Sequence, residues 1–163
     1  MIIGRGDIGS ILNDREDAIF FASGVSNSLE MRDSEYERER KLLSEQDKTK
    51  CIFYISSITI DNKEKFEMSK YLQHKKAMED YIKDKFKYYN IIRIGNITWG
   101  KNPNTFLNYI KNKIKNNESF FISDEYKYMV DKEQLLLLTD NLPLNGQNQI
   151  SIFGRMVKVK DLI

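Results

Sequence analysis

The chain has few of the residues that disulfide frameworks and metal sites require. Its 163 residues include one cysteine, Cys51, and one histidine, His74. A single cysteine excludes an internal disulfide, and a lone histidine without a cysteine pair argues against a structural zinc site. We therefore expect no bound metal and a reducing compartment such as the cytoplasm.

Long hydrophobic runs and an excess of one charge are missing as well. No apolar run approaches the about 20 residues that span a bilayer, and the first residues, MIIGRG, lack the pattern of a signal peptide. The 26 basic residues are nearly balanced by 24 acidic ones, which leaves a net charge of +2. Domains that bind nucleic acid usually carry a larger, clustered basic excess. We expect neither a membrane nor a nucleic acid as a partner.

What the chain does have is the composition of a folded domain. Hydrophobic residues make up 40% and charged residues 31%, which is typical of a globular protein rather than a disordered one. The length suits a single domain spanning residues 1–163, long enough to bury a core.

Short apolar runs alternate with amphipathic stretches. We predict strands at residues 1–3, 18–22, 51–55, 90–94, 120–122 and 150–153, and helices at residues 29–48, 64–87, 105–116 and 130–139. Continuous apolar runs such as residues 18–22 are typical of strands that a parallel sheet buries on both faces. The alternation predicts an α/β fold with a mostly parallel sheet.

The first motif with a chemical meaning is Gly4-x-Gly6-x-x-Gly9, between a predicted strand and a predicted helix start. Glycines at this spacing allow a tight turn and a close approach of the backbone to a pyrophosphate. The N-terminal amides of the following helix would point at that anion. The alternative interpretation is an ordinary strand-to-helix turn.

The second motif is Tyr71-x-x-x-Lys75 in a predicted helix, where residues four apart share a face. An ammonium beside a phenol is expected to lower the phenol's pKa from about 10 toward neutrality. Such a phenol can move a proton on a sugar hydroxyl. In a chain rich in Tyr and Lys the pattern also arises by chance. His74 faces away from both residues by roughly 100°, which predicts a surface or supporting role.

The third motif is Ser56-Ser57, at the carboxyl end of a predicted buried strand. Ligands of open α/β sheets bind outside these strand ends, where a hydroxyl can donate to a substrate oxygen. The alternative is a loop serine that caps a turn.

These motifs resemble a known superfamily when taken in order. The segments GRGDIG, FFASG, FYISS, YLQHKKAMEDYI and NIIRIGNITWGKNPNT cover most of residues 1–110. Together they resemble the extended short-chain dehydrogenases/reductases, the NAD-dependent epimerases and dehydratases that act on nucleotide-linked sugars. The resemblance implies a Rossmann-like, mostly parallel sheet flanked by helices, and a nucleotide sugar as the small-molecule substrate.

The resemblance also implies roles for individual residues. Tyr71 would be the catalytic acid or base, Lys75 would lower its pKa and hold the nicotinamide ribose, and Ser57, with Ser56 as the alternate, would bind the reacting oxygen. The residues that would contact NAD or NADP are Gly4, Arg5, Gly6, Ile8, Gly9, Ser23, Gly24 and Asn96.

The chain departs from the family between its first two predicted strands. Too few residues follow Gly9 for the family's second and third strands, and the strand near Phe20 resembles the fourth. This predicts the loss of most of the adenosine-binding wall, including the acidic residue that holds the ribose.

Two hypotheses follow. The first is a nucleotide-sugar epimerase or dehydratase that transfers a hydride transiently. The second is a non-catalytic module that binds a nucleotide sugar or assists a partner enzyme. A homodimer through residues 29–48 and 64–87 is a further prediction.

Overall fold

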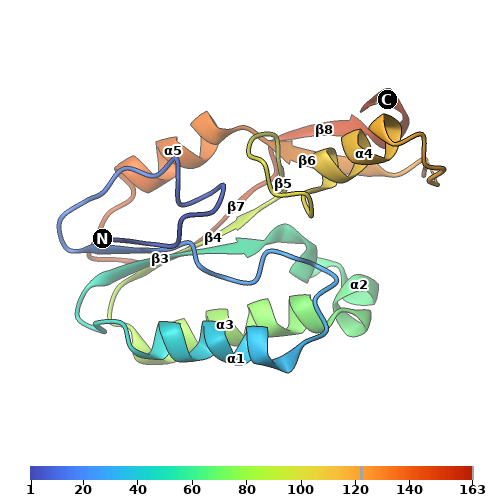
Figure 1. Cartoon of the computed structure of the whole chain (residues 1–163). Helices are drawn as coiled ribbons and strands as arrows, with labels where there is room; N and C mark the ends of the chain where they lie inside the picture. Colours follow the sequence, from blue (N-terminus) through green and yellow to red (C-terminus); the bar gives the residue numbers. More distant parts are fainter. Residues whose placement is uncertain (122, 163) are drawn as a thin grey trace.

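The computed structural model describes residues 1–121 and 123–162, which form a five-stranded parallel sheet and a small second sheet (Figure 1). The large sheet has the order β1-β2-β3-β4-β7. Its strands are β1 (Ile2–Ile3), β2 (Ala18–Phe21), β3 (Cys51–Ser57), β4 (Tyr89–Ile94) and β7 (Gln147–Ile152). One face is covered by α1 (Asp33–Ser44) and α3 (Lys70–Lys85), and the other by α5 (Lys132–Asn141). This confirms the predicted α/β, Rossmann-like architecture.

The strands form where apolar residues run without interruption. Successive side chains of a strand point to opposite faces, so each apolar run supplies two cores. Ile19 and Ile52 pack with the helices α1 and α3. Phe20 and Phe53 point toward α5, with ring centroids 4.6 Å apart. A strand that is apolar at every position therefore binds the helix layers on both sides of the sheet.

The predicted reduction of the sheet is confirmed. Among the described residues β1 pairs only with β2 and lies at the edge of the sheet. The 4–17 segment holds only turns, so the helix predicted after Gly9 is wrong. One turn forms there, where the Ser10 N–H donates to the Gly6 carbonyl at 2.9 Å. Arg15 then donates to the carbonyls of Thr139 and Leu142 at 2.9 Å, which holds this segment extended along the end of α5.

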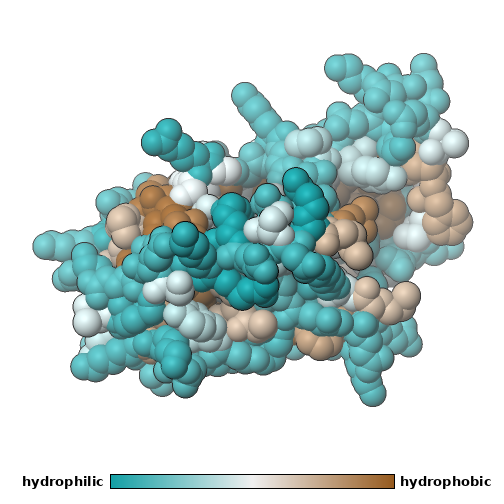
Figure 2. Space-filling view, turned by 60° about the horizontal axis from the view of Figure 1, so that its bottom comes forward, coloured by the Kyte–Doolittle hydropathy of each residue, from teal (hydrophilic) through white to brown (hydrophobic). Residues whose placement is uncertain are grey.

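Two predicted helices are shorter than the sequence pattern indicates. Residues 64–87 divide into α2 (Lys63–Met68) and α3, because Ser69 has an extended backbone and its Oγ accepts from the Leu72 N–H at 3.1 Å. The helix predicted over residues 29–48 is confined to α1. Its outward face and that of α3 are mostly hydrophilic (Figure 2). The predicted homodimer would therefore join charged rather than apolar helix surfaces.

The second sheet has the order β5-β6-β8 and was not predicted. It consists of β5 (Asn96–Ile97), β6 (Tyr126–Val130) and β8 (Arg155–Lys158), with α4 (Phe106–Lys115) beside it. The helix predicted from Val130 begins at Lys132, because Val130 belongs to β6. Phe120 and Phe121 are not in a strand, and Ile122 lies outside the described residues. Two short 3₁₀ turns, η1 (Ile58–Asp61) and η2 (Val159–Leu162), complete the element order.

No helix in residues 1–121 and 123–162 is long and apolar enough to cross a membrane.

Gly4 provides a test of the first turn. Its φ is +107°, and a Cβ there would lie 2.5 Å from the Ala22 carbonyl oxygen, whereas a Cβ on Gly6 would meet nothing within 4 Å. We expect Gly4→Ala to lower the free energy of unfolding by about 2 kcal/mol or more, through backbone strain and the clash. The matched Gly6→Ala should stay within about 0.5 kcal/mol of the wild type. Urea denaturation measures both, and equal stabilities would contradict the described turn.

Candidate functional site

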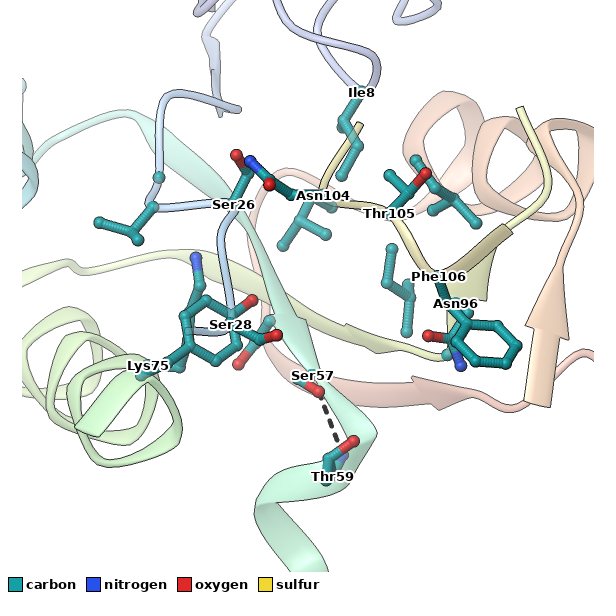
Figure 3. Close-up of a pocket in the computed structure, with 18 of the residues that line it drawn as sticks. Ile8, Ser26, Ser28, Ser57, Thr59, Lys75, Asn96, Asn104, Thr105 and Phe106 are labelled. Carbon is teal, nitrogen blue, oxygen red and sulfur yellow. Dashed lines mark hydrogen bonds between the residues drawn. The ribbon is translucent and has the colours of Figure 1, made fainter. Parts of the chain in front are cut away.

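A cavity of about 1180 Å³ opens at the carboxyl ends of β1 to β4. It lies between the large sheet and the β5-β6-β8 sheet, with loops 23–29 and 102–106 at its mouth. In Figure 3, Ser28, Ser57 and Lys75 lie on one side of the cavity, and Asn96 and Phe106 on the other. The carboxyl edge of a parallel sheet is where open α/β folds bind their ligands, so this cavity is the candidate site.

The cavity brings together nearly all the residues that the sequence singled out. Its lining includes Gly4, Arg5, Gly6, Ile8, Ser23, Gly24, Ser56, Ser57, Tyr71, Lys75 and Asn96. Gly9 is the exception, because it packs against its own turn: a Cβ there would lie 2.4 Å from the Gly4 carbonyl oxygen. The glycine loop and the tyrosine–lysine pair thus open into one space, although more than 60 residues separate Gly9 from Tyr71 in the sequence.

Tyr71 and Lys75 lie one turn apart on α3, as predicted. The Lys75 ammonium is 5.8 Å from the centroid of the Tyr71 ring and 4.9 Å from that of Tyr54. Lys75 is only 4% exposed. The ammonium is therefore almost buried at the floor of the cavity, nearer to the Tyr54 ring of β3 than to the ring of Tyr71.

A carboxylate that the sequence analysis missed explains this position. Glu39 of α1 is fully buried and lies 3.6 Å from the Lys75 ammonium. Its oxygens also accept from the Tyr54 hydroxyl at 2.7 Å and from the Val25 N–H at 2.8 Å, and His74 Nε2 lies 3.0 Å away. His74 is thus buried against Glu39 rather than on the surface.

One signal in the sequence could have revealed Glu39. It stands three residues after Tyr36 and four before Leu43, and all three are buried on the same face of α1. A carboxylate within the apolar stripe of a helix must meet a partner in the core. The many charged residues around Glu39 conceal this signal, because they are typical of a solvated helix.

Burial, more than any neighbouring charge, reverses the expected chemistry of Tyr71. Burial raises the pKa of the Tyr71 phenol, Lys75 lowers it, and Glu39 raises it again, which leaves the pKa above its usual 10.0. The sequence-based expectation of a pKa lowered toward neutrality is therefore wrong. The lysine's charge is compensated before it reaches the phenol. At neutral pH Tyr71 presents an O–H donor to the cavity.

The two serines have different surroundings. Ser57 faces the cavity, and its Oγ accepts from the Thr59 N–H at 3.2 Å (Figure 3). This contact leaves the Ser57 proton available for a ligand. Ser56 points toward the helix layer, and its buried Oγ has no hydrogen-bond partner within the described part of the chain. Ser57 is accordingly the better placed donor, in agreement with the sequence-based preference.

Basic side chains dominate the charge of the lining. The cations are Arg5, Arg38, Lys65, Lys75 and Lys127. Four of them pair with carboxylates outside the lining: Arg38 with Glu35, Lys75 with Glu39, and Lys65 and Lys127 with Glu125. Across the described residues, Asp7 is the single carboxylate on this lining, and it accepts from the N–H groups of Lys101 and Asn102 at 2.9 Å each. A cavity with this charge favours an anionic ligand.

The second sheet supplies aromatic surface. Tyr128 and Phe153 meet edge to face with centroids 5.1 Å apart, and the Lys127 ammonium lies 5.4 Å from the centroid of the Phe106 ring. All four residues line the cavity. Trp99 does not line the cavity; its Nε1–H donates to the Asp7 carbonyl at 2.9 Å.

The described residues fit one end of a dinucleotide and not the other. Tyr71, Ser57 and Asn96 gather where the resemblance places the nicotinamide, and the space beside Gly6 is open. In the described segment 4–17 no helix N-terminus follows the glycines to receive a pyrophosphate. Within residues 1–121 and 123–162 no strand lies beyond β1 to carry the ribose-binding carboxylate. The adenosine half of NAD therefore lacks its binding wall, and the complete cofactor does not fit the residues present.

The Glu39 cluster predicts that the protein loses stability as the pH becomes acidic. Burial raises the pKa of the Glu39 carboxyl, but Lys75, His74 and the Val25 N–H together hold it well below its ordinary 4.5. The stabilisation is complete above that ordinary value and is lost as the pH falls toward the folded-state pKa. Between about pH 5 and pH 3, the unfolding free energy of the wild type should fall more steeply with falling pH than that of Glu39→Gln. The two slopes should differ by up to about 1.4 kcal/mol per pH unit. Denaturant titrations at each pH measure this, and parallel curves would contradict it.

Comparisons with known proteins agree with this architecture. No protein-family model and no curated protein sequence matches the chain. Among solved structures, UDP-N-acetylglucosamine 4-epimerase from Methanobrevibacter ruminantium is 14% identical with a TM-score of 0.64, over 90% of this chain and 58% of that one. The enzyme WbmG of Bordetella bronchiseptica, in complex with NAD and UDP, is 12% identical with a TM-score of 0.60, over 89% and 53%.

A third similar structure is the capsular polysaccharide assembling protein CapF of Staphylococcus aureus. It is 21% identical with a TM-score of 0.55, over 90% of this chain and 42% of that one. The chain thus spans about half the length of the structures it resembles. Likeness at these identities establishes the fold. The chain has, in shortened form, the fold of these UDP-sugar 4-epimerase structures.

Proposed function

We propose that the protein binds a nucleotide sugar in this cavity without forming a tight complex with NAD. The observation that carries the proposal is the lining itself, on which the exposed or half-exposed cations Arg5, Arg38, Lys65 and Lys127 outnumber one carboxylate, Asp7, that is already hydrogen-bonded. A nucleoside diphosphate sugar supplies the complementary groups: a charged diphosphate, sugar hydroxyls and a flat base. Structures with the same fold are described in complex with UDP-N-acetylmuramic acid and with UDP-glucose.

The residues divide between the parts of such a ligand. Arg5 and Lys127 lie on the lining where they can neutralise the diphosphate, and charge-assisted hydrogen bonds of this kind contribute about 1.5–3 kcal/mol each. Tyr71 and Ser57 donate to sugar oxygens. Tyr128 and Phe153 offer ring faces and edges to the base or the apolar face of the sugar. These assignments use only residues that the cavity brings together.

The alternative function is an NAD-dependent epimerase or dehydratase acting on the same class of sugar. One observation favours it: Tyr71, Lys75, Ser57 and Asn96 share a single cavity with the glycine loop. The missing adenosine wall and the protonated state of Tyr71 favour the binding function. Because both functions use the same sugar site, the cofactor distinguishes them.

Calorimetry with UDP-glucose and with NAD tests the proposed function. We expect measurable binding of the nucleotide sugar and no heat with NAD at millimolar concentration. Lys127→Met should weaken sugar-nucleotide binding about tenfold or more, through the loss of a charged contact. Lys158→Met is the matched control: its side chain is 27% exposed against 26% for Lys127, and it lies in the same sheet outside the cavity lining. No binding of UDP-glucose or related nucleotide sugars, or equal losses in both variants, would refute the proposed site.

Tyr71→Phe separates binding from turnover. Under the binding proposal this variant loses one hydrogen bond to the sugar and weakens binding by a factor of about 5–10, while neither protein converts the sugar in the presence of NAD. Under the alternative the wild type turns over and the variant does not. Chromatography of nucleotide sugars after prolonged incubation with NAD measures this, and conversion by the wild type would establish the enzyme.

A further inference from the structure

The charged cluster under the cavity floor has a feature that neither the glycine loop nor the tyrosine–lysine motif accounts for. Glu39 belongs to α1, 36 residues before Lys75 in the chain, yet it is the carboxylate in contact with that lysine, at 3.6 Å. It is fully buried and its oxygens also meet Val25, Tyr54 and His74. A carboxylate with this many partners has a single orientation, so it determines where the ammonium rests.

The backbone around the cluster confines the Glu39–Lys75 ion pair. Gly24 crosses directly over it, since a Cβ at that position would lie 2.6 Å from the Lys75 Nζ and 3.0 Å from the Glu39 Oε1. Any other residue at position 24 would displace one of the two charged groups. The Tyr54 ring forms the opposite side, 4.9 Å from the ammonium. The lysine is thus confined between a glycine turn, a buried ring and a carboxylate.

We propose that Glu39 is a positioning residue for Tyr71: it holds the Lys75 ammonium in the buried cluster and compensates its charge, so that Tyr71 meets a ligand as a neutral hydrogen-bond donor. The inference deepens the proposed function, because a donor at this position suits an acceptor oxygen of a bound sugar. It rests on the proposed function only for the identity of that ligand. The state of Tyr71 itself is a property of the free protein.

The groups around the Tyr71 phenol support this assignment. The Lys75 ammonium lies 5.8 Å from the centroid of the Tyr71 ring and 3.6 Å from the Glu39 carboxylate. The charges of Lys75 and Glu39 act on the pKa of Tyr71, and Tyr71 is coupled to the phenols of Tyr36 on α1 and Tyr54 on β3. Lys75 is the cation of this set and Glu39 is its anion. Removal of the carboxylate leaves an uncompensated ammonium near the phenol and favours the phenolate, whereas removal of the ammonium has the opposite effect.

The test is the titration of Tyr71 in the ligand-free protein. The chain has nine tyrosines, so the ultraviolet absorbance of phenolate is recorded as a difference between each protein and the same protein carrying Tyr71→Phe. We expect Glu39→Gln to lower the Tyr71 midpoint by about one pH unit or more. Glu79→Gln is the matched control. Glu79 is equally buried and paired with Arg93 at 2.6 Å, but it lies outside the cavity lining.

Both Glu39→Gln and Glu79→Gln should lose stability, and only Glu39→Gln should shift the titration midpoint of Tyr71. An unchanged or raised Tyr71 midpoint in folded Glu39→Gln would overturn the proposal. Should that variant fail to fold, Lys75→Met provides the second measurement. With the carboxylate left in place it should raise the midpoint, and a midpoint at or below the wild-type value would overturn the proposal equally. Because no ligand is present, failure here is distinguishable from failure of the nucleotide-sugar proposal, which calorimetry reports.

Discussion

A carboxylate removed from water remains ionised only where other groups replace its hydration. Glu39 meets this requirement with a main-chain N–H, a phenol, an imidazole and an ammonium, drawn from three other segments of the chain. The turn after β2, the helices α1 and α3, and β3 are consequently held to one another at the floor of the cavity. Loss of any partner leaves a buried charge unmatched, so the shape of the site and the stability of this side of the fold depend on the same contacts.

The absence of two strands changes more than the width of the sheet. In a complete dinucleotide fold the glycine turn leads into a helix whose amides face the pyrophosphate. Here the chain has 14 residues between β1 and β2 and uses them to cross the end of α5, where Arg15 binds the last carbonyls of that helix. The turn is instead fixed from the other side, because the Asp7 carboxylate accepts from the backbone of loop 101–102. This contact keeps the cavity mouth formed without the helix.

The parts of the fold that the sequence predicts are those that depend on local pattern. Runs such as Ala18–Phe21 are apolar at every position, which only a strand buried on both faces requires, and the structure places them in the centre of the sheet. The strands β6 and β8 escaped prediction because their pairing joins residues about 30 positions apart and their exposed faces carry lysine and tyrosine. The same distance in sequence hid the state of Tyr71: its spacing to Lys75 is visible, whereas the carboxylate that compensates Lys75 comes from another helix.

These features together determine which ligand the cavity can distinguish. Each hydrogen bond that the ribose of a dinucleotide loses, because the carboxylate that would accept it is missing, weakens the binding free energy by about 1.5–3 kcal/mol. Dinucleotide affinity therefore falls by about tenfold to a hundredfold for each lost contact. The contacts on the sugar side are not diminished, because they come from β3, α3 and the second sheet, all of which are retained. A neutral phenol adds selectivity, because its O–H donates a hydrogen bond to a ligand that has an acceptor oxygen. A ligand without an acceptor oxygen would leave this donor buried and unsatisfied. Under the proposed function, shortening the fold in this way disfavours the cofactor relative to the sugar nucleotide, because the residues around Tyr71 are retained.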